Sequence, residues 1–202
     1  MPPAASPAPG PERPRPPRRA DARRNRELLL AAAREVFGER GTDAPLDEVA
    51  RRAGIGNATM YRHFPDRREL LIAAYADEVT ALCAQGEALL GDQSPQDALF
   101  TWLGAFIAHV AAKRDLAQAI PPDQGGQRAA LFAGWHEAMG STASRLLARA
   151  QAAGAVRAGL EASDLLALAS AIALAGAGPG QAGRYLDILR HGIVEPRPRY
   201  DG

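Results

Sequence analysis

A short run of polar side chains near residue 60 has the types and spacing needed to contact a nucleic acid. On a helix, these side chains lie opposite the apolar Met60 and Phe64 or at the edges of that outward side. Asn and Arg make paired hydrogen bonds to base edges, Ala contacts a thymine methyl group, and Thr, Tyr and His hold phosphate oxygens. The candidate DNA-contacting residues of this run are Asn57, Ala58, Thr59, Tyr61, Arg62 and His63.

The elements expected to position this run are two short helices joined by a glycine. The first, near residues 46–53, has an apolar stripe with the i, i+3, i+4 and i+7 spacing of a helix packed on a core. Gly54 is expected to end it, because glycine tolerates the left-handed conformation, and Ile55 then returns to the core. This arrangement is typical of a DNA-reading helix-turn-helix; the alternative is a buried helical hairpin with a polar outer face. The stripe consists of Leu46, Val49, Ala50 and Ala53.

Further helices are expected on both sides of this motif. The opening helix spans about residues 21–40 and is ended by Gly41. After the motif, Asp66 is expected to cap the next helix while Glu69 returns the bond, a capping box that fixes Arg67 in the first turn. The buried side of the opening helix is marked by Leu29, Ala33, Val36 and Phe37.

Together these residues resemble the DNA-binding domain of the TetR/AcrR family of transcriptional regulators. The resemblance covers about a third of the chain, in segments 27–41, 49–50, 53–55, 59–64 and 67–71. It implies that Arg67 touches a DNA phosphate, the alternative being an exposed surface arginine. It also implies that Arg23 and Arg24, in the first turns of the opening helix, lie near the DNA backbone.

Two positions depart from the family pattern. Gly56 stands where family members have Ser or Thr, and Pro45 stands where they have Thr. Glycine is still an acceptable helix cap and proline suits a first helical turn, so the fold is expected to survive. Two hydroxyl contacts to phosphate that the family pattern implies are absent.

The positive charge of the chain is concentrated at its start. The net charge is only +1, yet the residues up to Arg26 include seven arginines and two acidic residues, a local charge of +5. Residues 1–20 are expected to form a disordered arm rich in Pro and Arg. Such an arm can lie along phosphates or enter a minor groove, and the alternative is a solvated tail with no role.

Composition excludes several other classes of protein. The single cysteine, Cys83, excludes an internal disulfide and fits a reducing cytoplasm. No apolar run reaches transmembrane length and the start does not resemble a signal peptide, so a cytoplasmic protein without a membrane partner is expected. Paired nucleophile motifs, metal-ligand spacing of histidines and a phosphate-binding glycine loop are missing, so no enzyme, cofactor or metal site is expected.

The remainder of the chain is expected to be helical. Helices are predicted from Ser94 past Val110, over 115–120, 127–153, 163–177 and 181–194, with a loop at 121–126 and a tail at 195–202. The penultimate helix is apolar on nearly every side, so other helices are expected to cover both of its faces. We expect a homodimer through the last two helices, the alternative being a central buried helix in a monomer.

The middle helices carry most of the larger side chains of the chain, together with a few polar groups. The resemblance implies that these helices enclose an effector pocket, and an apolar cleft with few polar groups suits an apolar small molecule. The alternative for each residue is plain core. The candidate ligand-binding residues are Tyr75, Cys83, Trp102, Phe106, His109, Phe132, Trp135, His136 and Met139.

The sequence therefore predicts an all-α protein of two units. Residues 21–66 are expected to form a three-helix DNA-binding domain, and residues 67–194 a helical domain for effector binding and dimerisation. The expected function is that of a sequence-specific regulator that binds a palindromic double-stranded DNA operator. It is expected to be a repressor that a small-molecule effector releases. The alternative is an architectural protein that binds DNA without sequence preference.

Overall fold

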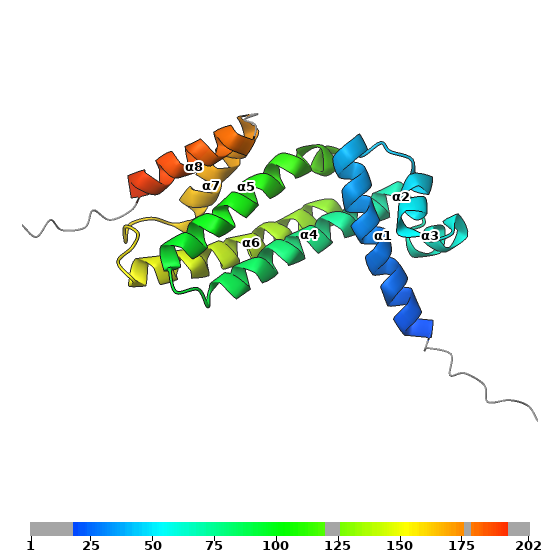
Figure 1. The fold of residues 1–202 in the computed structure, drawn as a ribbon, viewed down its shortest axis with the longest axis horizontal. Coiled ribbons are helices and arrows are strands. Elements are labelled where there is room, and N and C mark those ends of the chain that lie inside the picture. Colours follow the sequence, from blue (N-terminus) through cyan, green and yellow to red (C-terminus); the bar gives the residue numbers. More distant parts are fainter. Residues whose placement is uncertain (1–17, 120–125, 176–178, 194–202) are drawn as a thin grey trace, which may run out of the picture.

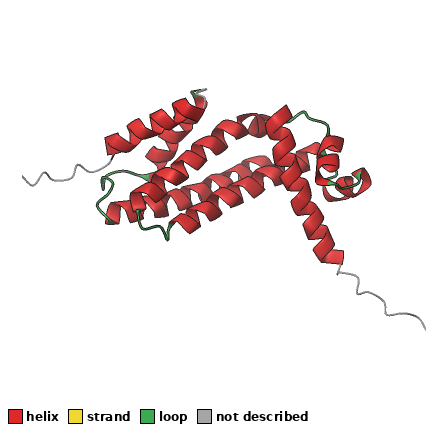
Figure 2. Ribbon diagram, in the orientation of Figure 1, coloured by secondary structure: helices red, strands yellow, loops and turns green. Residues whose placement is uncertain are grey.

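The computed structural model describes residues 18–119, 126–175 and 179–193. Over these residues the chain forms helices and loops and no strand, so the expected all-α fold is confirmed (Figure 2). The helices of the first unit are α1 (Arg18–Arg40), α2 (Leu46–Ala53) and α3 (Asn57–His63). Those that follow are α4 (Arg67–Leu89), α5 (Pro95–Ala119), α6 (Gln127–Ala152), α7 (Ala162–Leu174) and α8 (Pro179–Ile193).

The helices are grouped at two ends of an elongated molecule. In Figure 1, α1, α2 and α3 gather at the right, and α4 leads from them into a bundle with α5 and α6. Helices α7 and α8 pack on the side of α5. We call α1–α3 the head and α4–α8 the bundle. Helix α4 packs against α1 as well as against α5 and α6, so it connects the two groups.

The head is held together by the apolar stripes that the sequence predicts. Leu29, Val36 and Val49 are fully buried, and Met60 of α3 closes the small core from the other side. Gly54 ends α2 in the left-handed conformation with a φ of 67°, as predicted, and its N–H bonds back to the last turn. The short helices α2 and α3 are therefore set at a sharp angle by one residue without a side chain.

Several predicted boundaries differ from the observed ones. Helix α1 begins at Arg18, so residues 18–20 are helical and not part of the predicted arm; residues 1–17 lie outside the described residues. The separate helix predicted over 115–120 is wrong, because α5 runs unbroken to Ala119. Of the predicted loop at 121–126, only Gly126 is described, and it precedes α6 with a φ of 70°.

Helix α4 passes close to α5 and α6 at Gly86. Gly86 of α4 is buried there, and a Cβ at this position would overlap Thr142 Cγ2 and lie 2.9 Å from Trp102 Nε1. The Trp102 Nε1–H group donates a hydrogen bond to the carbonyl oxygen of Leu82, 3.0 Å away. Glycine is therefore needed at residue 86 for the three helices to approach so closely.

None of the helices in the described part of the chain combines the length and apolar character needed to cross a bilayer.

Candidate nucleic-acid interface

Helix α3 presents a polar face outward from the head. Its inward residues are as predicted, since Met60 is fully buried and Phe64, directly after the helix, is 3% exposed. Tyr61 is 45% exposed, although it is a large aromatic residue whose ring is usually covered. The other side chains that the sequence places outward, Asn57, Ala58 and Arg62, are also exposed.

Within this face, Arg62 is held by its neighbour on the helix. Its Nη2 donates a hydrogen bond to Thr59 Oγ1 at 2.7 Å. His63 is half-buried, with its ring centroid 6.5 Å from that of Phe64. The remaining donors of Arg62 stay available at the surface, because a guanidinium group carries five N–H groups.

The two departures from the family pattern leave their helices without a side-chain cap. Neither Pro45, before α2, nor Gly56, before α3, makes a side-chain hydrogen bond to the first turn. Both helices form nevertheless, because they are packed on the core of the head through Val49 and Met60.

Two arginines of α2 bind glutamates within the head. Arg52 donates from Nη1 and Nη2 to the two carboxylate oxygens of Glu39 at 2.7 and 2.8 Å, which ties α2 to α1. The hydrogen bond from Arg52 lowers the pKa of Glu39. Arg51 binds Glu48 in the same helix, and this hydrogen bond is the main reason for the lowered pKa of Glu48. The Glu39–Arg52 contact could not be read from the sequence, because it joins residues on different helices.

Arg67, a predicted phosphate contact, lies at the junction of head and bundle. Its Nη1 donates to the carbonyl oxygens of Thr42 and Ala44, at 2.5 and 2.8 Å. The Asp66 half of the predicted capping box is confirmed, since Asp66 accepts a hydrogen bond from the backbone N–H of Glu69 at 2.8 Å; the return bond from Glu69 stays a prediction. Arg67 therefore holds the loop between α1 and α2, and its half-buried guanidinium group shares its donors with that task.

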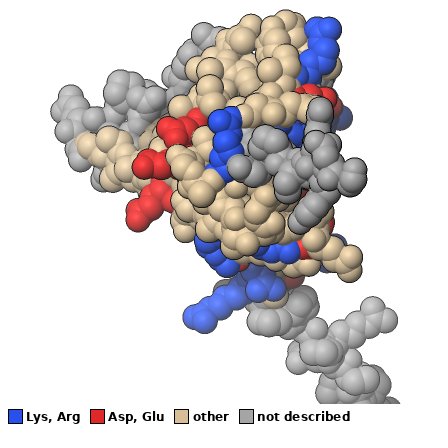
Figure 3. All heavy atoms as spheres, turned by 90° about the vertical axis from the view of Figure 1, so that its left-hand side faces the viewer, with Lys and Arg blue, Asp and Glu red and all other residues tan. Residues whose placement is uncertain are grey.

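The beginning of α1 supplies positive charge beside the head. Arg23 and Arg24 are exposed, and Arg23 Nε lies 3.6 Å from Glu27 Oε1. Arg26 lies over the ring of Phe64, 5.6 Å from its centroid, and so links α1 to the end of α3. In Figure 3, arginine side chains gather at the lower end of the molecule, where α1 begins.

Four of the predicted ligand-binding residues are brought together, and their rings pack on one another; Trp135 also lines an open hollow on α6. The ring of Tyr75 lies 4.6 Å from Trp135, 5.6 Å from Phe132 and 5.3 Å from His109, measured between centroids. Burial is the main reason that the pKa of Tyr75 is raised, and the nearby carboxylate of Glu78 adds to it. We call these four rings the aromatic cluster; it joins α4, α5 and α6.

The other predicted ligand-binding residues are dispersed. Trp102 is fully buried and stacks on Phe106, and Met139 is also core. Cys83 is half-buried, and His136 is exposed on α6, with Nδ1 2.7 Å from the carbonyl oxygen of Phe132. Within the described residues, no three His, Cys, Asp or Glu side chains gather as metal ligands would.

Family models match both parts of the chain. Residues 29–74 match the model described as bacterial regulatory proteins of the tetR family. Residues 94–195 match the model of the C-terminal domain of SbtR-like transcriptional regulators.

Solved structures of TetR regulators are similar over most of the chain. The TetR transcriptional regulator SCO0520 from Streptomyces coelicolor is 35% identical, with a TM-score of 0.72, covering 84% of this chain and 98% of that one. A TetR transcription regulatory protein from Mycobacterium vanbaalenii is 32% identical, with a TM-score of 0.73, covering 89% of this chain and 100% of that one. Both head and bundle are included in matches of this extent.

Curated relatives match over a shorter stretch. The HTH-type transcriptional regulators TtgW, described as uncharacterized, and SrpR, both from Pseudomonas putida, are each 41% identical over 58 residues. The match covers 28% of this chain, 43% of TtgW and 27% of SrpR, so the chain spans less than half the length of these relatives. Together with the helix-turn-helix geometry of α2 and α3, the comparisons show that this chain belongs to the TetR family and is a DNA-binding transcriptional regulator, not an enzyme.

Proposed function

We propose that this regulator is a repressor that binds a palindromic operator as a homodimer and is released from it by a small molecule. The observation that carries the proposal is the outward face of α3, where polar and small side chains are exposed over a fully buried Met60. A helix of this kind fits the major groove, because its inner side is anchored and its outer side carries hydrogen-bonding groups.

We assign different roles to the residues of this face. Asn57 and Arg62 read base edges through paired hydrogen bonds, and Ala58 contacts a thymine methyl group. Phosphate contacts fix the register of the head without reading sequence. The residues assigned to phosphates are Thr59, Tyr61 and His63 on α3, Arg23 and Arg24 on α1, and Arg67 at the start of α4.

The homodimer is proposed to form through α7 and α8. Four large apolar side chains are exposed on these two helices: Leu168 at 48%, Leu174 at 51%, Tyr185 at 36% and Ile188 at 69%. The opposite side of α7 is covered within the subunit, where Leu165 is fully buried. An exposed apolar face on two adjacent helices suits a four-helix interface with a second copy, which would place two heads for two half-sites.

Release by a small molecule is typical of the family, and here α4 supports it. This helix begins directly beside the head and runs without interruption through the bundle. Asp77 Oδ2 of α4 accepts a hydrogen bond from Arg34 Nη1 of α1 at 2.7 Å, so α4 is also tied to the head by an ion pair. A ligand that favours one position of α4 would thus change the position of the head and the affinity for DNA.

Selection of the purified protein against random duplex DNA at physiological salt tests the proposal. A palindromic site is the expected result. Enrichment of no sequence, with binding that falls steeply as salt rises, would instead support an architectural protein without sequence preference.

Substitutions on α3 then test the individual roles. Tyr61→Ala is expected to weaken binding to all DNA equally, whereas Asn57→Ala and Arg62→Ala each cost about 1–3 kcal/mol and also relax base preference. Equal losses on every operator variant for all three substitutions would contradict the assignment of base readers.

Sedimentation of an Ile188→Glu variant tests the interface. A monomer is expected, because the substitution places a charge in the centre of an apolar contact. A dimer of unchanged stability would place the interface elsewhere.

A further inference from the structure

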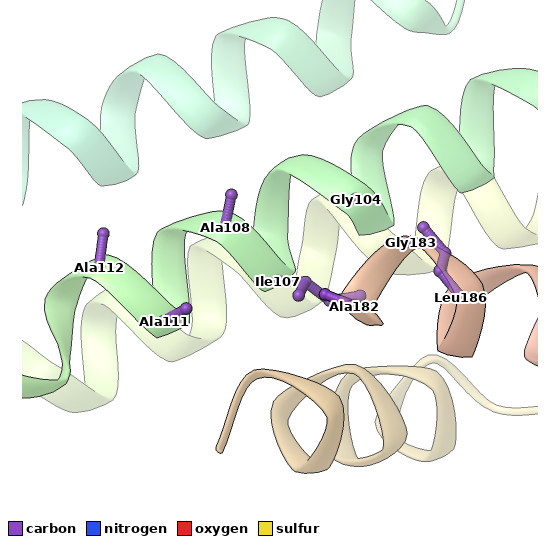
Figure 4. A pocket seen from close by; sticks show the side chains of 8 residues that line it. All are labelled: Gly104, Ile107, Ala108, Ala111, Ala112, Ala182, Gly183 and Leu186. Carbon is purple, nitrogen blue, oxygen red and sulfur yellow. The ribbon is translucent and has the colours of Figure 1, made fainter. Parts of the chain in front are cut away.

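A groove lies between α5 and α8 (Figure 4). Its volume is about 450 Å³, within the range of sites that bind small molecules. Ile107 and Ala108 of α5 form one wall, and Ala182 and Leu186 of α8 form the other. None of the predicted ligand-binding residues is among its described lining residues.

The groove exists because the two helices carry small residues where they face each other. A Cβ built on Gly104 of α5 would lie 3.4 Å from Leu186 Cδ2, so the two helices are in ordinary contact there. A Cβ built on Gly183 of α8 would have no atom within 4 Å, so the space beside it is open. The helices are also in contact nearer the start of α5, where Arg190 of α8 binds Asp97 and lies over the ring of Phe100. The open volume lies on the other side of Gly104, beside Gly183.

The described lining residues favour an uncharged ligand. All eight residues labelled in Figure 4 are glycine, alanine, isoleucine or leucine, so none of these side chains can hydrogen-bond or balance a charge. Transfer of an ionised group from water to such a surface costs several kcal/mol and is not repaid. An uncharged, largely apolar molecule gains from the same transfer.

A second copy of the chain is a poorer occupant of the groove. The large apolar side chains that a subunit interface uses, such as Leu168, Tyr185 and Ile188, line a different hollow, between α7 and α8. In the α5–α8 groove, by contrast, Ile107 is buried and Gly104 and Gly183 carry no side chain. Such a groove suits a small molecule that enters it.

We propose that the groove between α5 and α8 binds an uncharged apolar small molecule and is the effector site of this regulator. The inference rests on the proposed function, of which it names the site and the chemical class of ligand. Ala108 in the groove is adjacent to His109, whose ring packs on Tyr75 of α4. Asp77 of the same helix binds Arg34 of the head, so the groove lies two helix contacts from α1.

The neutral dye N-phenyl-1-naphthylamine, whose fluorescence rises in apolar surroundings, tests the site in the full chain. Saturable binding to the wild type is expected, with displacement by 1-decanol and at least tenfold weaker displacement by decanoate and decylammonium. No saturable binding would overturn the site, and equal displacement by the charged compounds would overturn the ligand class.

Two groove-filling variants and one matched control locate the dye. Gly183→Leu fills the groove from α8 and Ala108→Phe fills it from α5; both are expected to weaken dye binding at least tenfold. Gly180→Leu makes the same change on α8 at a residue that also has open space but is not among the described lining residues, and it should bind as the wild type does. Unchanged binding in both groove variants would overturn the proposal.

Operator binding separates this inference from the proposed function. With the palindrome selected by the wild type, 1-decanol is expected to weaken DNA binding of the wild type and of Gly180→Leu, and to leave that of Gly183→Leu unchanged. If no palindrome is selected, the proposed function fails while the dye experiment still decides whether the groove binds apolar molecules. If Gly183→Leu loses operator affinity without ligand, the variant is not correctly folded. The response to 1-decanol is then measured with Ala108→Phe.

Discussion

The two sides of helix α5 differ in the size of the side chains they present. Toward α4, α5 carries Trp102, Phe106 and His109: Trp102 stacks on Phe106, and His109 meets the ring of Tyr75 edge-on. Toward α8 it carries Gly104 and Ala108, beside a groove of about 450 Å³. Large aromatic residues therefore fill a helix contact, whereas the open volume lies where most of the facing residues are glycine or alanine.

The largest effect on stability is expected on the side of α5 that faces α4. Trp102→Ala removes a fully buried ring and the donor of the hydrogen bond to the Leu82 carbonyl oxygen. We expect it to lower the free energy of unfolding by about 3–5 kcal/mol. Urea unfolding followed by circular dichroism measures this; a loss below about 1 kcal/mol would mean that this side is not closely packed.

The next largest loss of stability is expected when a methyl group is added where α4 meets α5 and α6. Gly86→Ala places a methyl group against Thr142 and Trp102 and should cost about 1–3 kcal/mol of the free energy of unfolding. Gly140→Ala on α6 is the matched control, because a Cβ there has no atom within 4 Å. Equal stability of the two variants would argue against the close approach of α4, α5 and α6.

The same change on the groove side is expected to be favourable. Gly183→Ala adds a methyl group in open space within a helix, so we expect the free energy of unfolding to rise by about 0.5–1 kcal/mol. Thermal and urea unfolding beside the wild type check the sign. Destabilisation by this variant would show that α5 and α8 close over the groove.

The smallest effect is expected from the exposed ion pairs of the head, where neither packing nor a cavity is involved. The pKa of Glu39 is lowered in the folded state, first by its hydrogen bond from Arg52. Its contribution to stability is therefore present above the unfolded pKa and is lost as the pH falls through the lower, folded value. Arg52→Gln should remove this part of the acid dependence, seen as a smaller decrease in Tm from pH 7 to pH 3 than in the wild type. An identical decrease would show that the pair contributes nothing measurable.

The head was predictable from the sequence because its signals are local. The burial of Met60 and Phe64 and the left-handed Gly54 follow from spacing and from the conformational freedom of glycine. The contact of Arg67 with the carbonyl oxygens of Thr42 and Ala44 was not predictable, because it joins residues that are distant in the chain. The base-reading and phosphate roles of the α3 residues stay predictions.

In the bundle, the helices were predictable from the sequence, but the groove between α5 and α8 was not. Large side chains such as Trp102 and Tyr75 are predicted ligand contacts, yet they bury the most area and therefore pack on neighbouring rings. A groove lined by Gly104, Ala108 and Gly183 leaves no comparable signal, since small residues are common on helices of every kind. The continuation of α5 to Ala119 was missed for a related reason, because no residue there marks a start or a stop.

The close approach at Gly86 gives helix α4 the mechanics of a lever with its fulcrum near one end. Gly86 is confined by α5 and α6, whereas Arg67 at the other end lies beside the loop that supports α2. At the rise of an α-helix, the arm between these two residues is about 28 Å long. A tilt of only about 5° around Gly86 would therefore shift the head end of α4 by roughly 2.5 Å, enough to displace a hydrogen-bonded side chain from a base edge.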